Sequence, residues 1–439
     1  MEIKAVVLAA GKGTRMKSQT PKVLHEIAGK PLLGYVLGAV APLVNETFVI
    51  TGHGADEVNA YVNEYKNVKT VLQSPQLGTG DAVAKVLPHL ENYKGLVLVL
   101  CGDTPLITHE TLESFIAYHK KSGADLTVMS AVFDDPTGYG RIIRSACPPL
   151  EGGPEFLQTS IQAKIPRGGQ ILRVMEEKDA NPKEKAIKEV NAGIYLFDWQ
   201  KIKPAFSKLT TGNAQGEYYL TDIVEWAQNK TAYTLENNDE ILGINSRSDL
   251  AEAAKIMNRR TLESLMDNGV TIVDPESTWI SADTKIGEDT IIYPATYIEG
   301  KNTIGKNCKI GPFAHLRGEV EIADNVKIGN FVEVKKSKIA SDTNAGHLSY
   351  IGDSEVGSNV NIGAGTITAN YNALTKEKHK TVIKDNVKIG SNSVLVAPVE
   401  LEEGANVGAG SVITKNIPPW ALALTRAPLK IVEDFSKEK

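Results

Sequence analysis

The sequence predicts two different folds in one chain of 439 residues, an α/β domain followed by a parallel β-helix. Two observations support this prediction. In the first half, short apolar runs alternate with stretches of helical period, which is typical of βαβ units around a mainly parallel sheet. In the second half, aliphatic residues return at every sixth position, a period that neither a helix nor a strand explains.

The strands of the α/β domain are expected at its short apolar runs. These runs are Ile3–Ala10, Thr47–Thr51, Thr70–Leu72, Leu96–Cys101 and Leu126–Val132. Helical period separates them, for example at Leu32–Leu43 and Gly80–Leu90. Ligands of such sheets bind outside the carboxyl ends of the strands, and the polar and glycine-rich residues cluster in the loops there. The pattern therefore favours a nucleotide-binding domain.

The β-helix is expected from residues that recur six positions apart. All ten such positions from Ile280 to Val334 are Ile, Leu or Val, and a second register runs from Ile383 to Ile413. Each segment is expected to form a short strand and a turn, with the aliphatic side chain inside the coil. The frame breaks before Val356 and again before Ile383, so the chain is expected to bulge or loop out at both places. Polar residues in these breaks point to a function beyond a structural coil.

Composition and the remaining segments exclude several classes of protein. Asp249–Met266 has helical period and is expected to form a helix between the halves. The net charge of −5, without a Lys/Arg block, argues against a nucleic-acid partner. Three distant cysteines indicate neither disulfides nor a zinc site, and the longest apolar runs are far shorter than the ~20 residues of a membrane span. With no signal-peptide pattern either, a cytoplasmic protein is expected.

A glycine-rich loop follows the first expected strand. It reads Leu8-Ala-Ala-Gly-Lys-Gly-Thr-Arg15, and Lys22 follows seven residues later. The loop lacks the third glycine of a GxGxxG fingerprint and the GK[ST] end of a P-loop. Gly11 and Gly13 allow backbone N–H groups to approach phosphate oxygens, while Arg15 and Lys22 could neutralise a triphosphate. Taken alone, a turn with two solvated cations is the commoner interpretation.

Asp103 is a candidate metal ligand. It follows the run Leu96–Cys101 through Gly102, which places a carboxylate at the carboxyl edge of the expected sheet. Mg²⁺ typically takes one or two protein ligands and completes its shell with water and phosphate oxygens, so one Asp is a sufficient anchor. An isolated Asp in a turn is a cap about as often as a ligand.

The motifs form an ordered set through nearly the whole chain. They are LAAGKGTRM…PKVLH, LQSPQLGTGDA, CGDTPL, TGYGRI, MEEKDA, EVNAGIY, NAQGEYYLTDI and GIN, then NFVEVKK, AGHLSYIGD, NIGAGTITANY, GSNSVLVAPV and TRAP. This set resembles the bacterial bifunctional N-acetylglucosamine-1-phosphate uridyltransferase/glucosamine-1-phosphate N-acetyltransferase. The resemblance implies a glycosyltransferase-A-like (Rossmann-like) α/β uridyltransferase domain over 1–245, a helical linker over 246–268, a left-handed β-helix acetyltransferase domain over 269–426 and a tail over 427–439. It also implies a homotrimer.

For the first domain, the resemblance implies Mg²⁺-dependent uridyl transfer from UTP to N-acetylglucosamine 1-phosphate. Arg15 and Lys22 would act on the phosphates, and Asp103 with Asn245 would hold the metal. The implied substrate-binding residues are Leu8 and Gly11 in the loop, Gln73, Gly78 and Thr79 around the uracil, and Gly140, Glu176 and Asn191 at the sugar. The alternative for Glu176 and Asn191 is surface or capping polarity.

For the second domain, the resemblance implies acetylation of glucosamine 1-phosphate by acetyl-CoA, with His347 as general base. Removing a proton from an attacking amine requires a base that titrates near neutral pH, which suits His, although a lone loop histidine is more often merely solvated. The residues implied to bind the sugar phosphate are Arg317, Lys335, Tyr350, Asn361 and Lys378. Those implied to hold acetyl-CoA are Ala364, Asn370, Tyr371, Ser391, Ala409 and Arg426.

The sequence departs from the family pattern at several positions. Cys101 stands where some relatives have an aromatic residue, and Ala146–Gly169 exceeds the family's short turn, so a surface elaboration is expected there. The Asn370–Lys380 loop is extended, which leaves open whether Lys376 or Lys378 contacts the sugar.

A rival hypothesis is a single-activity sugar-phosphate nucleotidyltransferase whose β-helix is structural or regulatory. The polar set in the frame breaks, His347, Tyr350, Asn370 and Tyr371, favours two activities because a structural coil would not require it.

Overall fold

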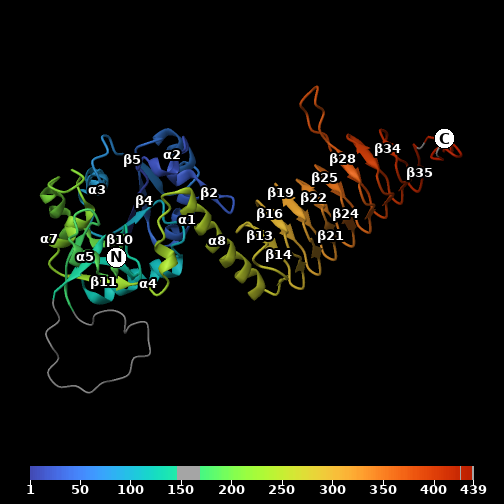
Figure 1. Ribbon diagram of the computed structural model, residues 1–439. Helices are drawn as coiled ribbons and strands as arrows, with labels where there is room; N and C mark the ends of the chain where they lie inside the picture. The colour runs from blue at the N-terminus through green and yellow to red at the C-terminus, as the bar shows by residue number, and fades with distance from the viewer. Residues whose placement is uncertain (146–168, 426, 438–439) are drawn as a thin grey trace, which may run out of the picture. The chain divides into compact units, whose positions relative to one another are not determined.

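The computed structural model describes residues 1–145, 169–425 and 427–437. The chain divides into two compact units, Met1–Ile256 and Met257–Lys439 (Figure 1). Residues 146–168 of the surface elaboration expected over Ala146–Gly169, and the predicted ligand-binding residue Arg426, lie outside the described residues.

A nine-stranded sheet forms the centre of the first unit, in the order β11-β7-β10-β6-β1-β4-β5, with β8 paired to β10 and β9 paired to β8. The strands are β1 (Ile3–Leu8), β4 (Glu46–Thr51), β5 (Val68–Leu72), β6 (Leu96–Cys101), β7 (Leu126–Val132), β8 (Arg141–Arg144), β9 (Ile171–Met175), β10 (Glu189–Asp198) and β11 (Lys230–Thr234). Strands β6, β1, β4 and β5 run parallel, whereas β10 is antiparallel to both β6 and β7. A short hairpin of β2 (Glu26–Ile27) and β3 (Lys30–Pro31) lies apart from this sheet.

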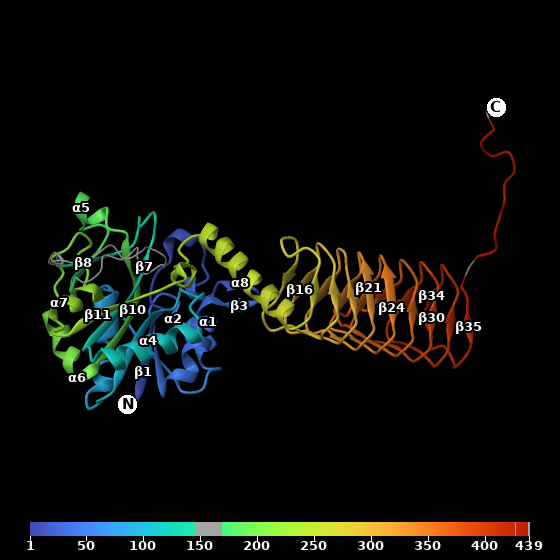
Figure 2. The ribbon, with the colours of Figure 1, turned by 90° about the horizontal axis from the view of Figure 1, so that it is seen from below.

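Both faces of this sheet are buried because its strands alternate inward positions between two cores. Ala5 and Val7 belong to one core and Val6 to the other. Helices α1 and α4 lie side by side (Figure 2) and pack into the first core. The helices are α1 (Leu32–Val40), α2 (Ala55–Val62), α3 (Thr79–Ala84), α4 (His109–Ser122), α5 (Pro182–Lys185), α6 (Trp199–Ile202) and α7 (Ile223–Trp226). The helix expected over Gly80–Leu90 is α3 followed by a 3-10 turn that begins with Leu87-Pro88, since proline lacks the N–H that would continue an α-helix.

Helix α8 (Arg247–Asp267) forms where a connecting helix was expected, but it begins two residues earlier. The hydroxyl of Ser246 accepts the Asp249 N–H at 3.2 Å, and the Asp249 carboxylate accepts the Ser246 N–H at 2.8 Å. This reciprocal capping box starts the helix.

Within the described ranges, no helix is long and apolar enough to cross a membrane.

The second unit is a β-helix of three parallel sheets. The first sheet contains β12 (Thr271–Ile272), β15 (Ile291–Ile292), β18 (Lys309–Ile310), β21 (Lys327–Asn330), β24 (Asn344–His347), β27 (Asn361–Ile362), β30 (Lys388–Ile389), β33 (Asn406–Val407) and β35 (Leu422–Ala423). The second contains β13 (Trp279–Ile280), β16 (Tyr297–Glu299), β19 (His315–Arg317), β22 (Glu333–Lys335), β25 (Tyr350–Gly352), β28 (Ile367–Ala369), β31 (Val394–Val396) and β34 (Val412–Ile413). The third contains β14 (Lys285–Ile286), β17 (Thr303–Ile304), β20 (Glu321–Ile322), β23 (Lys338–Ile339), β26 (Ser354–Val356), β29 (Thr381–Ile383) and β32 (Val399–Leu401).

The first frame break neither bulges nor loops out, so that expectation was wrong there. Buried Ile339, Ala345 and Ile351 continue the inward row from Val334 to Val356. The coil continues because two of its repeats have five residues instead of six. The corner of each shortened repeat contains a buried serine. A count of residues cannot distinguish two shortened corners from a loop.

The two serines explain how the shorter corners close. The Ser337 hydroxyl donates to the Lys335 carbonyl at 2.8 Å and accepts the Ser354 N–H at 3.0 Å. The Ser354 hydroxyl donates to the Gly352 carbonyl at 2.8 Å. Each hydroxyl thus satisfies backbone groups that the tight corner leaves unpaired.

The second frame break forms the expected loop. Residues 371–378 are exposed between β28 and β29, and the loop projects from the coil (Figure 1). Its neck is closed by a bridge between Tyr371 and Lys378, and the Asn372 N–H donates to the Glu377 carbonyl at 2.9 Å.

Candidate active sites

The glycine-rich loop after β1 positions Lys22. Gly13 adopts φ +57°, and a Cβ there would lie 2.7 Å from the Lys22 Cβ, so a larger residue would displace the lysine. A Cβ on Gly11 would meet nothing, and Arg15 is exposed. Glycine is therefore required for steric reasons at Gly13. At Gly11 the space beside the backbone is open, so a ligand can approach it.

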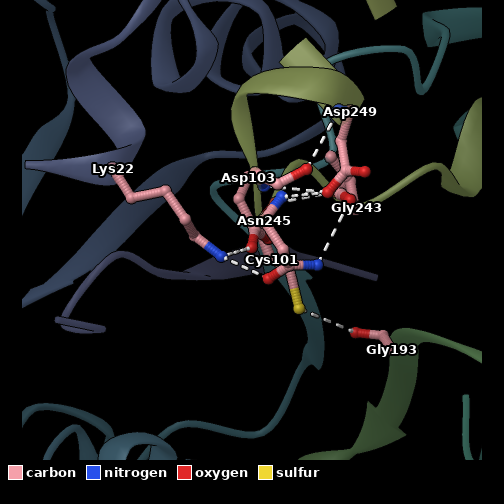
Figure 3. Close-up of polar contacts among 9 residues, drawn as sticks. Lys22, Cys101, Asp103, Gly193, Gly243, Asn245 and Asp249 are labelled. Atoms are coloured by element: carbon pink, nitrogen blue, oxygen red, sulfur yellow. Dashed lines mark hydrogen bonds and ion pairs between the residues drawn. The ribbon is translucent and has the colours of Figure 1, made fainter. Parts of the chain in front are cut away.

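The two predicted metal ligands converge on one point at the end of β6. The Lys22 ammonium donates to the Asp103 carboxylate and to Asn245 Oδ1, the latter at 3.0 Å (Figure 3). The Ile244 N–H donates to the Asp103 carbonyl at 2.9 Å, which holds the Asn245 segment against Asp103. Two oxygens thus face one cation, which fits Mg²⁺ because this ion keeps several waters and binds substrate phosphates. No group of three or more His, Cys, Asp or Glu within the described residues could hold a metal.

Asp249 was not among the residues expected from sequence. Its carboxylate accepts the backbone N–H of Asn245 at 2.9 Å (Figure 3), in addition to its bond with Ser246. Burial raises the pKa of Asp249, but these hydrogen bonds and the charge of Arg15 outweigh burial and lower it. The capping-box spacing of Ser246 and Asp249 was the signal that could have identified it.

Cys101 lies two residues before the predicted metal ligand Asp103 and is unsuited to nucleophilic chemistry. Its thiol approaches the Gly193 carbonyl at 3.7 Å. Burial raises the pKa of Cys101 to about 12, and the negative charges of Asp103 and Glu176 add to the shift. The thiol therefore stays neutral beside these negative charges.

The predicted sugar-binding residues lie at or next to three neighbouring strands, with Gly140 before β8, Glu176 after β9 and Asn191 on β10. The Asn191 N–H donates to the Gly140 carbonyl at 2.8 Å, and the Asn191 amide donates to the Tyr195 hydroxyl at 2.7 Å. Glu176 follows β9 and accepts the Thr221 hydroxyl at 3.1 Å. Burial raises the pKa of Glu176 despite this hydrogen bond. The interpretation of Glu176 as mere surface polarity does not fit this partly buried position.

The predicted uracil-binding residues also lie together. The buried Gln73 side chain donates to the Gly78 carbonyl and to Asp81, both at 2.9 Å. Gly78 has φ +111°, and a Cβ there would lie 2.6 Å from the Tyr218 carbonyl oxygen. The Thr79 hydroxyl accepts the Leu220 N–H at 3.0 Å. These contacts join the segment to the chain around Thr221, and therefore to Glu176.

In the second unit, His347 ends strand β24 and is exposed. Its Nδ1 lies 2.9 Å from Asn330 Oδ1 on the preceding coil. The His347 carbonyl accepts the Ser349 hydroxyl at 2.8 Å. Ala364, Ser391 and Ala409 occupy the matching position after β27, β30 and β33, so they continue one row along the same corner of the coil.

Three predicted phosphate-binding cations lie close to one another. Arg317 Nη2 pairs with Glu333 at 2.6 Å. The approach of the Lys378 ammonium, followed by burial and the charge of Arg317, lowers the pKa of Lys335. Lys376 instead occupies a left-handed turn position of the loop, with φ +60°. The structure therefore places Lys378 with the other cations.

The remaining predicted residues differ in exposure. Asn370 is buried, and its amide donates to the Asp353 carboxylate and to the Tyr350 hydroxyl, the latter at 3.4 Å. Tyr371 is 55% exposed, and Asn361 is also exposed, on β27. Asn370 is thus a partner of Tyr350, whereas Tyr371 and Asn361 are free to meet a ligand.

In a comparison with known proteins, each of the two units matches a different family model. The family model of the MobA-like NTP transferase domain matches residues 5–162, and that of the bacterial transferase hexapeptide (six repeats) matches residues 303–336 and 380–415. A solved structure of a putative glucose-1-phosphate thymidylyltransferase from Bacillus anthracis covers 58% of this chain and 94% of its own, at 18% identity and a TM-score of 0.45, a likeness too distant to bear on function.

Two curated relatives match along the full length. The bifunctional protein GlmU of Geobacillus thermodenitrificans is 44% identical over 461 residues, covering 96% of this chain and 95% of the relative. The bifunctional protein GlmU of Caldanaerobacter subterraneus is 43% identical over 475 residues, covering 100% and 98%. With both units matched in one alignment, the chain belongs to the GlmU family of bifunctional uridyltransferase/acetyltransferases.

Proposed function

We propose that the two activities are divided between the two units, so that the second unit acetylates glucosamine 1-phosphate and the first couples the product to UTP. The observation that supports this division is the presence of a separate polar site in each unit. Lys22, Asp103 and Asn245 form one, and His347 with its row forms the other.

Uridyl transfer requires positioning and charge neutralisation more than covalent help from the protein. A phosphate oxygen of N-acetylglucosamine 1-phosphate attacks the α-phosphorus of UTP, and pyrophosphate leaves. Arg15 and Lys22 neutralise the triphosphate, while Gln73 and Glu176 hold the base and the sugar. Asp103 and Asn245 would hold Mg²⁺, which would supply further charge neutralisation at the phosphates.

Acetyl transfer requires a base for the attacking amine. The amine nitrogen of glucosamine 1-phosphate attacks the thioester carbonyl of acetyl-CoA, the C–N bond forms, and the C–S bond breaks. His347 takes the proton that the amine loses, and the departing thiolate then accepts a proton. Arg317, Lys335 and Lys378 hold the phosphate of the sugar, because their gathered positive charge needs an anion.

The acetyltransferase site is proposed to work in a homotrimer. His347, Ser391 and Ala409 are exposed along one corner of a rod-like coil, which cannot by itself enclose a ligand as long as acetyl-CoA. A second copy would supply the missing wall, and a closed ring leaves no open contact to propagate. The number three comes from the family resemblance. UTP and acetyl-CoA are cytoplasmic metabolites, which makes the cytoplasm the proposed site of action.

One assay tests the assignment of both activities. The purified protein is incubated with glucosamine 1-phosphate, acetyl-CoA, UTP and Mg²⁺, and the products are analysed by mass. UDP-N-acetylglucosamine is expected, and omission of UTP should leave N-acetylglucosamine 1-phosphate. If acetylated sugar never forms while supplied N-acetylglucosamine 1-phosphate is still uridylated, the single-activity alternative is correct.

A further inference from the structure

Asn330 occupies the row position one coil before His347, and the backbone brings their side chains into contact. Strands β21 and β24 pair with Asn330 opposite His347, and the Leu348 N–H donates to the Asn330 carbonyl at 3.0 Å. A Cβ on Gly329 would lie only 1.8 Å from the Gly346 carbonyl oxygen. Glycine at position 329 therefore permits the close approach of the two coils immediately before the Asn330–His347 pair.

The contact determines which ring nitrogen of His347 carries its proton. Asn330 Oδ1 lies 2.9 Å from His347 Nδ1, and an amide oxygen accepts hydrogen bonds but donates none. Nδ1 must therefore be protonated, which leaves the lone pair of neutral imidazole on Nε2. We propose that Asn330 is a positioning residue for acetyl transfer, which selects the His347 tautomer that uses Nε2 as the base. This inference rests on the proposed role of His347.

The coil itself does not require an amide at this position. The same row holds Ala364, Ser391 and Ala409 on later coils, so small side chains are compatible with the corner. Asn330 is half-buried, and its one side-chain hydrogen bond among the described residues is to His347. A structural role would not explain why the amide occurs at the coil that faces the histidine.

The charged groups around His347 are few. On the two strands that pair with β24, the ionisable side chain is Lys327, which lies opposite Asn344 rather than His347. Around the corner, β22 carries Lys335 and Glu333, of which Glu333 is already paired with Arg317, and β25 carries Tyr350. A carboxylate introduced at position 330 would therefore be the nearest negative charge to the imidazole.

The test compares Asn330→Ala and Asn330→Asp in the full-length protein. For Asn330→Ala, kcat of acetyl transfer should fall about 10-fold or more, a part of the 10²–10⁴ that a general base supplies, with an unchanged KM for glucosamine 1-phosphate. Asn330→Asp keeps an acceptor of the same shape, so it should recover activity at high pH. Its charge stabilises the imidazolium, and the acid limb of its pH–rate profile should move to higher pH. Asn344→Ala, on the same strand as His347, is the matched control and should act as wild type.

The outcomes separate this inference from the proposed function. Wild-type kcat in Asn330→Ala would overturn it, as would equal losses in Asn330→Ala and Asn330→Asp with no displacement of the pH profile. Uridyl transfer, measured on the same preparations, should stay constant and reports that the chain is folded. If His347→Ala acetylates normally, the proposed function fails. If only His347→Ala is inactive, the role of Asn330 alone is wrong.

Discussion

The Lys22 ammonium lies 3.0 Å from Asn245 Oδ1, although the two residues are 223 positions apart in the sequence. The same ammonium also binds the Asp103 carboxylate. A lysine thus faces the two oxygens that are proposed to hold Mg²⁺. Mg²⁺ held by these oxygens would compete with the ammonium, and a displaced ammonium would be available to the phosphates of UTP.

Lys22→Met should weaken catalysis but strengthen metal binding. Uridyl transfer should fall about 10²–10³-fold, as when one donor is removed from a charge-stabilising site. Without UTP, Mn²⁺ binding followed by electron paramagnetic resonance should become tighter, because no ammonium competes for the oxygens. Lys12→Met removes the same charge from an exposed position of the loop and is the control. Equal Mn²⁺ affinity in both variants would contradict the displacement.

Asp103→Asn should affect one activity and spare the other. Replacing the carboxylate weakens the proposed metal site, so uridyl transfer should fall by at least about 10²-fold, given the several kcal/mol that a metal supplies to such a transition state. Acetyl transfer should stay near the wild-type rate. Both rates are measured in separate assays on one preparation, and parallel loss of the two in a folded protein would argue against independent sites.

His347→Ala should produce the opposite pattern. Acetyl transfer should fall by about 10²–10⁴-fold because the general base is lost, whereas uridyl transfer should persist. The measurement covers pH 6 to 9, since proton removal by other groups would become visible at high pH. An unchanged acetylation rate across this range would remove His347 from the mechanism.

Lys378→Ala and Lys376→Ala form a matched pair in the projecting loop. Lys378 lowers the pKa of Lys335, so the two ammonium groups are close enough to share an anion. The Lys378 variant should raise the KM for glucosamine 1-phosphate, and the Lys376 variant should leave it near the wild-type value. The reverse order would assign the sugar contact to Lys376.

Asp222→Asn should stabilise the first unit at neutral pH. Burial, with the charges of Glu225 and Asp179, raises the pKa of Asp222 to about 6 from its ordinary value of 3.8. The native state therefore favours the protonated carboxyl, and stability is lost as pH rises from about 4 through 6. The Tm of Asp222→Asn should exceed that of wild type at pH 8, and the difference should shrink at pH 5. Asp239→Asn, an exposed carboxylate of the same unit, should show no such pH dependence.

Much of the fold was predictable because it is encoded by periodicity. The row from Ile280 to Val334 points into the coil, and the runs at Leu96–Cys101 and Leu126–Val132 form strands. The shortened corners at Ser337 and Ser354 were not predictable, because their closure depends on hydrogen bonds between successive coils. Periodicity reports which residues point inward and says nothing of what joins neighbouring turns.

In the candidate sites too, some residues were predictable from the sequence and others were not. Asp103 and His347 were recognised because their motifs name them, and their side-chain chemistry suits the roles. Asn330 was missed because it acts through His347, which folding brings near from the next coil. Asp249 was missed although its capping-box spacing from Ser246 is visible in the sequence, because that spacing does not show that the carboxylate also accepts the Asn245 N–H. An amide in a hexapeptide has no local signature that separates an orienting contact from a solvated surface.

The backbone fixes the distance between His347 and Ala409. The members of the row between them lie on successive strands of one sheet, so their separation is a whole number of strand spacings, each about 4.8 Å. From β24 to β33 there are three such steps, or about 14 Å. Side-chain rotation cannot alter this backbone distance. In the proposed complex, this fixed spacing therefore selects acyl donors by length. An acyl donor with a shorter or longer arm between its nucleotide and its thioester would place its carbonyl away from His347.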